Sequence, residues 1–161
     1  MQDAIAGLSQ EYDIHLDYFE VGNYTDSKCI NAPLFFRAID DNGTYKSKLV
    51  INNACPFWIN LSYRDKVLRS GYFAGDTIED FVEHELAHVM TFQSCATMED
   101  YKKLEATLHP MFTNGVSRYS WDEKDGSETI AEAFVKMRKG KRVNKDARKL
   151  LDKYTEVWKY D

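Results

Sequence analysis

Apolar and polar residues alternate in the first part of the chain, and a helical period replaces this alternation from about residue 77 onward. Alternation is typical of strands, whose successive side chains point to opposite faces. Strands are therefore predicted over residues 14–21, 48–52 and 57–62. In the third of these, Trp58 and Asn60 would share one face. Residues 41–43, Asp-Asn-Gly, are a turn signal.

Capping side chains mark the expected helix starts. Asp76, with Glu79 three residues later, resembles a capping box. The later starts are marked by Thr97 with Asp100, by Ser127 and by Asn144. Helices are expected over residues 3–12, 77–93, 97–112, 128–138 and 144–159, and a loop over residues 114–126. Strands that precede most of the helices predict an α+β fold.

Length and composition indicate one soluble globular domain over residues 1–161, with 43% hydrophobic and 29% charged residues. No apolar run approaches the ~20 residues of a membrane span, so no membrane partner is expected. The N-terminal residues lack the basic start and apolar block of a signal peptide. We therefore expect a cytoplasmic protein, with secretion as the alternative if a signal peptide has been removed.

Cysteine usage and charge narrow the picture a little further. Cys29, Cys55 and Cys95 are odd in number and form no CxxC pair, which argues against a disulfide framework and favours a reducing compartment. The net charge of −5 argues against a nucleic-acid partner. Residues 136–153 nevertheless carry nine Lys or Arg and two acids. We interpret this basic run as a solvated helix face, with a nucleic-acid patch as the alternative.

The segment from His84 to His88 reads His-Glu-Leu-Ala-His, an HExxH pattern. Residues i and i+4 of a helix lie one turn apart on the same face, so two imidazoles can bind one Zn²⁺. Glu85, directly after the first histidine, can take a proton from a water bound beside them. A chance occurrence of the pattern is the alternative.

The residues around this pattern favour the zinc site over chance. Glu85 falls inside a broad apolar arc of the predicted helix, and His84 and His88 lie at the edge of that arc. The arc consists of Ile78, Phe81, Val82, Leu86, Val89 and Phe92. A carboxylate on a face that is turned to the core is costly unless it has a partner or a task.

A catalytic zinc needs a third protein ligand, and no histidine follows His88 at a suitable distance. His15 and His109 are interpreted as ordinary surface or core histidines. Glu128 and Glu132 lie one helical turn apart, so one can bind zinc while the other accepts the free N–H of a ligating histidine. The alternative, an exposed acidic helix start, explains Glu128 but not Glu132, whose neighbours are apolar.

HELAH, followed forty residues after its second histidine by ETIAEAF, resembles the gluzincin peptidases. It is most similar to the family of the anthrax lethal factor catalytic domain, which includes relatives in phages and mobile elements. The resemblance implies a zincin-like domain with a small mixed sheet packed on helices. It also implies Glu128 as the third ligand, Glu132 behind a histidine, and Tyr119 as oxyanion donor. The gap from Tyr119 to Glu128 is longer than in that family, with Tyr72 and Tyr101 as substitutes.

The function expected from these features is a zinc endopeptidase with one Zn²⁺ per chain and a protein or peptide substrate. The alternatives are a phage or mobile-element regulator that cleaves one specific partner, and a structural protein that keeps the fold without activity. The substrate is expected to lie extended along the predicted strand 57–62, touching Trp58 and Asn60. In the alternative for that strand, it is central and Trp58 is core packing.

Overall fold

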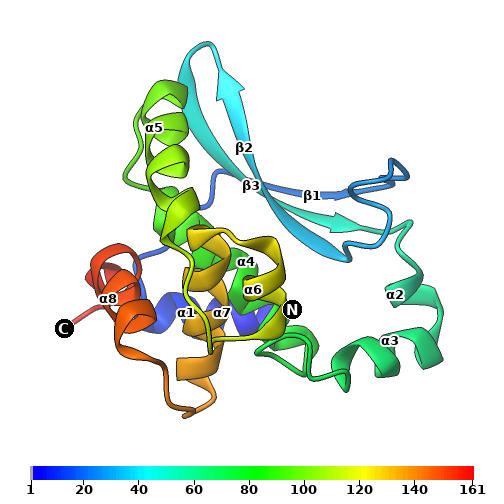
Figure 1. Ribbon diagram of the computed structural model, residues 1–161. Coiled ribbons are helices and arrows are strands. Elements are labelled where there is room, and N and C mark those ends of the chain that lie inside the picture. Colours follow the sequence, from blue (N-terminus) through cyan, green and yellow to red (C-terminus); the bar gives the residue numbers. More distant parts are fainter. Residues whose placement is uncertain (1) are drawn as a thin grey trace.

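The strands lie in the first third of the chain and most helices follow, so the predicted α+β class is confirmed (Figure 1). The computed structural model describes residues 2–161. The strands are β1 (Tyr18–Gly22), β2 (Leu34–Asp41) and β3 (Thr44–Asn52). The α-helices are α1 (Gln2–Glu11), α2 (Pro56–Ile59), α3 (Leu61–Leu68), α4 (Ile78–Phe92), α5 (Met98–Leu108), α6 (Arg118–Glu123), α7 (Gly126–Arg138) and α8 (Lys145–Tyr154). Two short 3-10 helices are η1 (His109–Met111) and η2 (Glu156–Trp158).

The sheet is small and mixed, with strand order β1-β3-β2. β2 and β3 form an antiparallel hairpin, in which Phe36 lies opposite Leu49, and β1 pairs with β3 in parallel. Asn42 and Gly43 connect the hairpin with φ angles of 52° and 87°, so the predicted turn is confirmed. Since β3 is central, β2 and β1 are the two edge strands.

The strand predictions were only partly right. Residues 48–52 lie within β3, but the predicted strand 14–21 begins only at Tyr18. β2 was not predicted at all. Its start, Leu34-Phe35-Phe36, is a continuous apolar run, because this edge strand is partly covered on both faces. A short apolar run carries no period that separates a strand from a helix.

The predicted strand 57–62 was wrong, because these residues belong to α2 and α3. Pro56 occupies the first turn of α2, where its fixed φ and missing N–H suit a helix start. Asn60 caps α3 by accepting a hydrogen bond from the backbone N–H of Tyr63 at 3.0 Å. Proline and asparagine therefore act here as helix-start residues, and this local effect outweighs a six-residue alternation.

The substrate-binding roles predicted for Trp58 and Asn60 lose their basis, because both roles required a strand over residues 57–62. The Trp58 indole is partly buried and donates a hydrogen bond to the carbonyl of Pro33 at 3.3 Å. Ile59, which in a strand would lie on the face opposite Trp58 and Asn60, is 79% exposed. Neither Trp58 nor Asn60 lines the cavities beside the candidate site described below.

The predicted helix starts were close. Thr97 and Asp100 form the capping box of α5, and Asn144 caps α8, as predicted. The box of α4 is formed by Thr77 with the residue three positions later, so it lies one residue after the predicted one. α7 is capped by Asp125, two residues before the predicted cap. The predicted loop 114–126 contains α6, which was missed.

α4 lies at the centre of the molecule, where it packs against α7, α1 and β2 (Figure 1). Leu86 and Met90 of α4, and Ile130 and Phe134 of α7, are fully buried in the core that these elements share. The apolar periodicity of both helices thus fixes their relative position. Among the described residues, no helix is long and apolar enough to cross a membrane.

Ion pairs between charged side chains tie the end of α7 to α4 and α1. Arg138 contacts Glu11 at 2.6 Å and Glu83 at 3.3 Å, and Lys139 contacts Asp80 at 2.7 Å. Burial alone would raise the pKa of Asp80, but the Lys139 ammonium and backbone N–H donors outweigh it and hold that pKa below its usual value. Arg138 and Lys139, two cations of the basic run, are therefore paired with acids inside the fold.

Candidate metal centre

α4 presents His84, Glu85 and His88 to the interior of the protein. Their exposed fractions are 7%, 9% and 6%, far below what polar side chains usually keep. The two histidines are one turn apart, and their ring centroids are 5.0 Å from each other. The spacing that the sequence prescribes therefore places both imidazoles on one face of a buried helix.

Glu128, in the first turn of α7, faces both histidines. Its Oε2 lies 3.1 Å from His84 Nε2, and its Oε1 lies 3.5 Å from His88 Nε2. The ligand atoms of the three side chains all lie within 4.8 Å of one another, so this group could hold a metal ion. Two imidazole nitrogens and one carboxylate are a donor set that zinc enzymes use.

The hydrogen bonding of Glu128 fits a metal ligand. Its Oε2 is buried and, within residues 2–161, accepts no well-formed hydrogen bond, although His84 is close. A buried carboxylate oxygen without a donor is costly, and a cation would remove that cost. Burial alone would raise the pKa of Glu128, but His88 and His84 outweigh it and hold the pKa well below its usual value. Glu128 is therefore ionised.

Glu132, one turn further along α7, lies behind His84. It is 2% exposed and accepts a hydrogen bond from His84 Nδ1 at 2.8 Å. A carboxylate can only accept, so Nδ1 carries the proton and Nε2 is the atom that faces Glu128. Burial would lower the pKa of His84, but Glu128 and Glu132 raise it well above its usual value. Glu132 also accepts from the backbone N–H of Ala74 at 2.6 Å.

Glu85 is held from the other side, by the sheet. Its Oε2 accepts a hydrogen bond from the backbone N–H of Phe36, on β2, at 2.7 Å. Burial raises the pKa of the Glu85 carboxyl above its usual value, although the nearby His84 and His88 act in the opposite direction. A carboxylate with a raised pKa accepts a proton more readily, as a general base requires.

Tyr119 reaches the site from α6. Its backbone N–H donates to the carbonyl of Tyr72 at 2.9 Å, and its ring centroid lies 4.9 Å from that of Phe73 and 5.9 Å from that of His84. Burial, reinforced by Glu128 and other carboxylates, raises the pKa of Tyr119 far above its usual value. Its hydroxyl therefore stays protonated and can donate a hydrogen bond.

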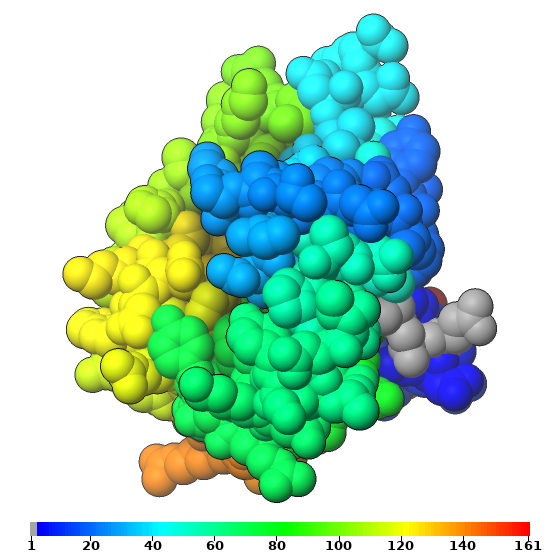
Figure 2. Space-filling model, turned by 90° about the vertical axis from the view of Figure 1, so that its right-hand side faces the viewer, coloured from blue at the N-terminus to red at the C-terminus, as the bar shows by residue number. Residues whose placement is uncertain are grey.

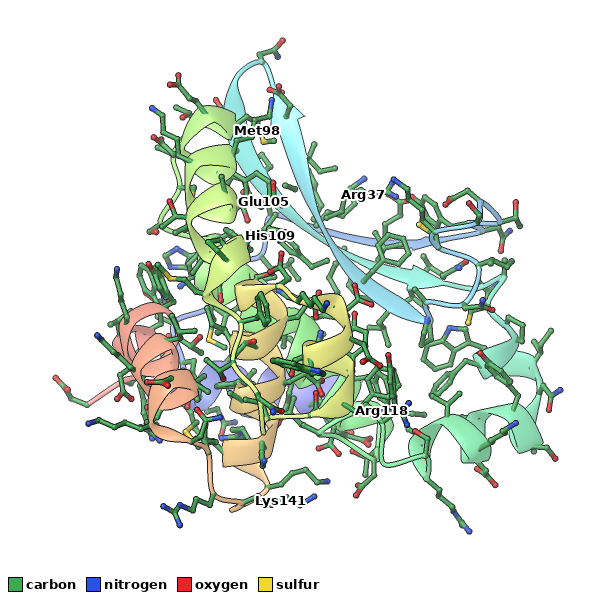
Figure 3. All side chains as sticks on the ribbon, in the orientation of Figure 1. Arg37, Met98, Glu105, His109, Arg118 and Lys141 are labelled. Atoms are coloured by element: carbon green, nitrogen blue, oxygen red, sulfur yellow. The ribbon has the colours of Figure 1, made fainter. Side chains whose placement is uncertain are left out.

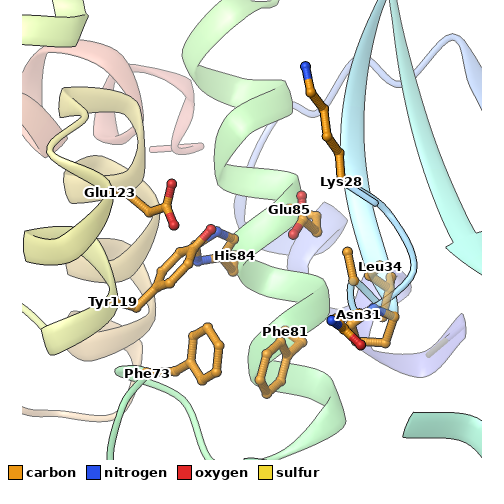
Figure 4. Close-up of a pocket in the computed structure, with 11 residues that line it drawn as sticks. Lys28, Asn31, Leu34, Phe73, Phe81, His84, Glu85, Tyr119 and Glu123 are labelled. Atoms are coloured by element: carbon orange, nitrogen blue, oxygen red, sulfur yellow. The ribbon is translucent and has the colours of Figure 1, made fainter. Parts of the chain in front are cut away.

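Two adjoining cavities meet at these residues, and both are lined by His84, Glu85 and Tyr119. The cavity of about 310 Å³ extends towards Phe73 and Phe81 (Figure 4), where Tyr119 and α4 stand opposite the segment before β2. In Figure 2 the yellow surface of α6 lies opposite the blue surface of the segment before β2.

The second cavity, of about 420 Å³, runs between β2 and α5. Glu105 and His109 line it from the side of α5 and η1 that faces the sheet (Figure 3). His109 Nδ1 lies 2.7 Å from Asp125, and Tyr101 donates to Glu105 at 2.7 Å. The two cavities together give a cleft that passes the candidate metal ligands.

His15 and Tyr72 line neither cavity, whereas Tyr101 lines the second cavity together with the candidate ligands. His15 is exposed and pairs with Asp13 at 3.0 Å. Tyr72 donates to Asp122 at 3.1 Å, and its carbonyl holds the backbone of Tyr119. Of the three tyrosines considered, Tyr119 alone lines both cavities.

Sequence reasoning missed Phe36, Phe73, Ala74 and Glu123 among the residues of the site. Phe36 lies on the strand that was not predicted, and Ala74 contributes only its backbone. Glu123 lines both cavities from α6, in the predicted loop. Two glycines flank the segment that contains Phe73 and Ala74, and they were its only signal.

No protein-family model, no curated protein and no solved structure matches the chain. The chain has an α+β fold, with a group of His84, His88 and Glu128 that could hold a metal ion.

Proposed function

We propose that this protein is a zinc-dependent endopeptidase with a zincin-like fold and a site of the gluzincin type. The observation that carries the proposal is the convergence of His84, His88 and Glu128 beside Glu85, a buried carboxylate that is not one of the three ligands. Structural zinc sites have four protein ligands and are closed. Within residues 2–161 three ligand atoms converge, and a cleft leads to them, which supports a catalytic site.

The chemistry divides among the residues of the chain. A zinc ion held by the two histidines and Glu128 would supply a Lewis acid and lower the pKa of a bound water to roughly 7. Glu85 takes one proton from the attacking water and passes it to the amine nitrogen as the peptide C–N bond breaks. Tyr119 donates a hydrogen bond to the oxyanion that develops on the carbonyl. Glu132 orients His84.

The substrate is a polypeptide that lies extended in the cleft between β2 and α5. β2 is the edge strand beside α4, and an edge strand offers unpaired backbone groups to an added strand. β2 therefore replaces residues 57–62 as the strand along which a peptide would bind.

The test compares wild type, Glu85→Gln and His84→Ala in zinc content and in cleavage of a peptide library from a whole proteome. His15→Ala is the matched control, because His15 is exposed and lies away from the site. We expect one zinc and specific cleavage for wild type and control, zinc without cleavage for Glu85→Gln, and neither for His84→Ala. Equal cleavage by Glu85→Gln, or stoichiometric zinc in His84→Ala, contradicts the proposal.

A further inference from the structure

Phe36 contacts both the candidate general base and a candidate metal ligand. Its backbone N–H donates to Glu85 Oε2 at 2.7 Å. Its ring stacks on the imidazole of His88, with centroids 5.9 Å apart and an interplanar angle of 27°, and on Phe92 at 5.7 Å and 10°. In the described part of the chain, the bond from Phe36 is the one hydrogen bond that the Glu85 carboxylate accepts.

The position of Phe36 in the sheet explains why its N–H is free for Glu85. In an antiparallel pair, successive residues of an edge strand turn their backbone groups alternately towards the partner strand and away from it. Phe36 points its N–H towards α4, so Arg37 points its own towards β3, where it lies opposite Lys48. The edge N–H of Phe36, which would otherwise face water, is thus used inside the site.

The two contacts join parts of the site that come from different elements. His84, Glu85 and His88 are carried by α4, and Glu128 by α7, whereas Phe36 belongs to the sheet. A carboxylate on a helix can rotate about its side-chain bonds, so one short bond from a second element fixes its direction. The stacked ring likewise limits rotation of the His88 imidazole.

We infer that Phe36 is a positioning residue: its backbone N–H orients the Glu85 carboxylate, and its ring orients the His88 imidazole. This inference rests on the proposed peptidase function for its kinetic consequences, while the two contacts can be tested without any activity. Phe36 itself takes no part in bond making.

The direct test measures hydrogen–deuterium exchange of single amides by NMR in the metal-free protein. The Phe36 amide is expected to exchange at least tenfold faster in Glu85→Ala than in wild type. The Arg37 amide, which faces β3, is the internal control and should keep its rate. If the Phe36 amide exchanges at the same rate in both proteins, Glu85 does not hold it and the inference is wrong. This result does not depend on whether the protein is a peptidase.

The kinetic test compares Phe36→Ala, which keeps the N–H, with Phe36→Pro, which lacks it. Both variants lose the ring, so both should bind zinc about 2- to 10-fold more weakly in chelator competition. Only Phe36→Pro should lose a further ~10²-fold in kcat, the usual scale for a misplaced catalytic group, with little change in KM. Proline is tolerated on an edge strand at a position where the N–H that it replaces points away from the neighbouring strand.

Each alternative outcome has a definite meaning. Wild-type zinc affinity in Phe36→Ala overturns the role of the ring. A raised KM with unchanged kcat in Phe36→Pro means that the N–H serves the substrate instead of Glu85, which overturns the role of the backbone. If Phe36→Pro does not fold, the exchange rates decide. If the wild-type protein binds zinc but cleaves no peptide, the proposed function is wrong. The contacts of Phe36 with Glu85 and His88 can still be tested in that case.

Discussion

Glu132 is the residue whose replacement should disturb the metal centre most without removing a ligand. Its side chain is 2% exposed and accepts hydrogen bonds from His84 Nδ1 at 2.8 Å and from the Ala74 backbone at 2.6 Å. Glu132→Ala leaves both donors unpaired. Glu132→Gln keeps the volume, but its single oxygen can satisfy only one donor, and its NH₂ group faces the other.

The cost follows from the burial of each donor. The His84 ring is buried, so an unpaired Nδ1–H costs about 1–3 kcal/mol. Ala74 is only partly buried, so water can replace the carboxylate there and the loss is nearer about 1 kcal/mol. Glu132→Ala should therefore destabilise the protein by about 2–4 kcal/mol, and Glu132→Gln by about 1–3 kcal/mol. Zinc should bind roughly 10–100-fold more weakly in both, because His84 loses its orientation.

Two assays separate these effects. Urea unfolding in the presence of a chelator gives the stability of the metal-free protein, and chelator competition gives the zinc dissociation constant. Glu79→Gln is the matched control, because Glu79 is exposed in the first turn of α4. Wild-type zinc affinity in Glu132→Gln would refute the reasoning. A loss of zinc affinity in either Glu132 variant that exceeds the loss in Glu128→Ala would refute it as well.

Three further predictions concern the scaffold and the oxyanion donor. A Cβ at Gly126 would lie 2.1 Å from the carbonyl oxygen of Leu108, so Gly126→Ala should lower the free energy of unfolding by about 1–3 kcal/mol in urea titrations; an unchanged midpoint contradicts this. Tyr119→Phe should keep zinc and lose about 10²–10³-fold in kcat, and a loss of less than threefold removes Tyr119 from the mechanism. The pKa of Asp80 is lower in the folded protein than its ordinary value, so its contribution to stability is present above about pH 4 and is lost as the pH falls further. Urea midpoints measured from pH 6 to 3 should therefore fall more steeply for wild type than for Lys139→Met; parallel curves contradict the pairing.

Local sequence signals were sufficient for the centre of the fold. α4 was predicted from its apolar period and an acidic capping pattern, with an error of one residue at its start. The same period placed Glu85 inside the apolar arc, with His84 and His88 at its edge, and all three residues are buried. A helix carries this information locally, because residues four apart become neighbours whatever the rest of the chain does.

Sequence patterns failed where a short pattern competed with a helix cap, or where pairing between strands decided the structure. Residues 57–62 alternate like a strand, yet Pro56 and Asn60 start helices there. β2 was missed because its apolar start has no period, and its strand character comes from pairing with β3. Tyr119 was assigned to a loop, although Ser117 caps a short helix, α6, at that point. For residues 57–62 and for α6, helix-start residues outweighed a short local pattern, whereas β2 was decided by pairing with a neighbouring strand.

The partners of the buried carboxylates were the hardest part to predict, for a physical reason. The apolar arc around Glu85 predicted that this carboxylate has a partner or a task, since an unpaired buried charge is costly. The partner is the backbone N–H of Phe36, and Glu132 similarly binds the N–H of Ala74. Every residue except proline has such a donor, so no residue type marks it in a sequence. A sequence can therefore show that a buried acid needs a donor, whereas only the fold can show which peptide group supplies it.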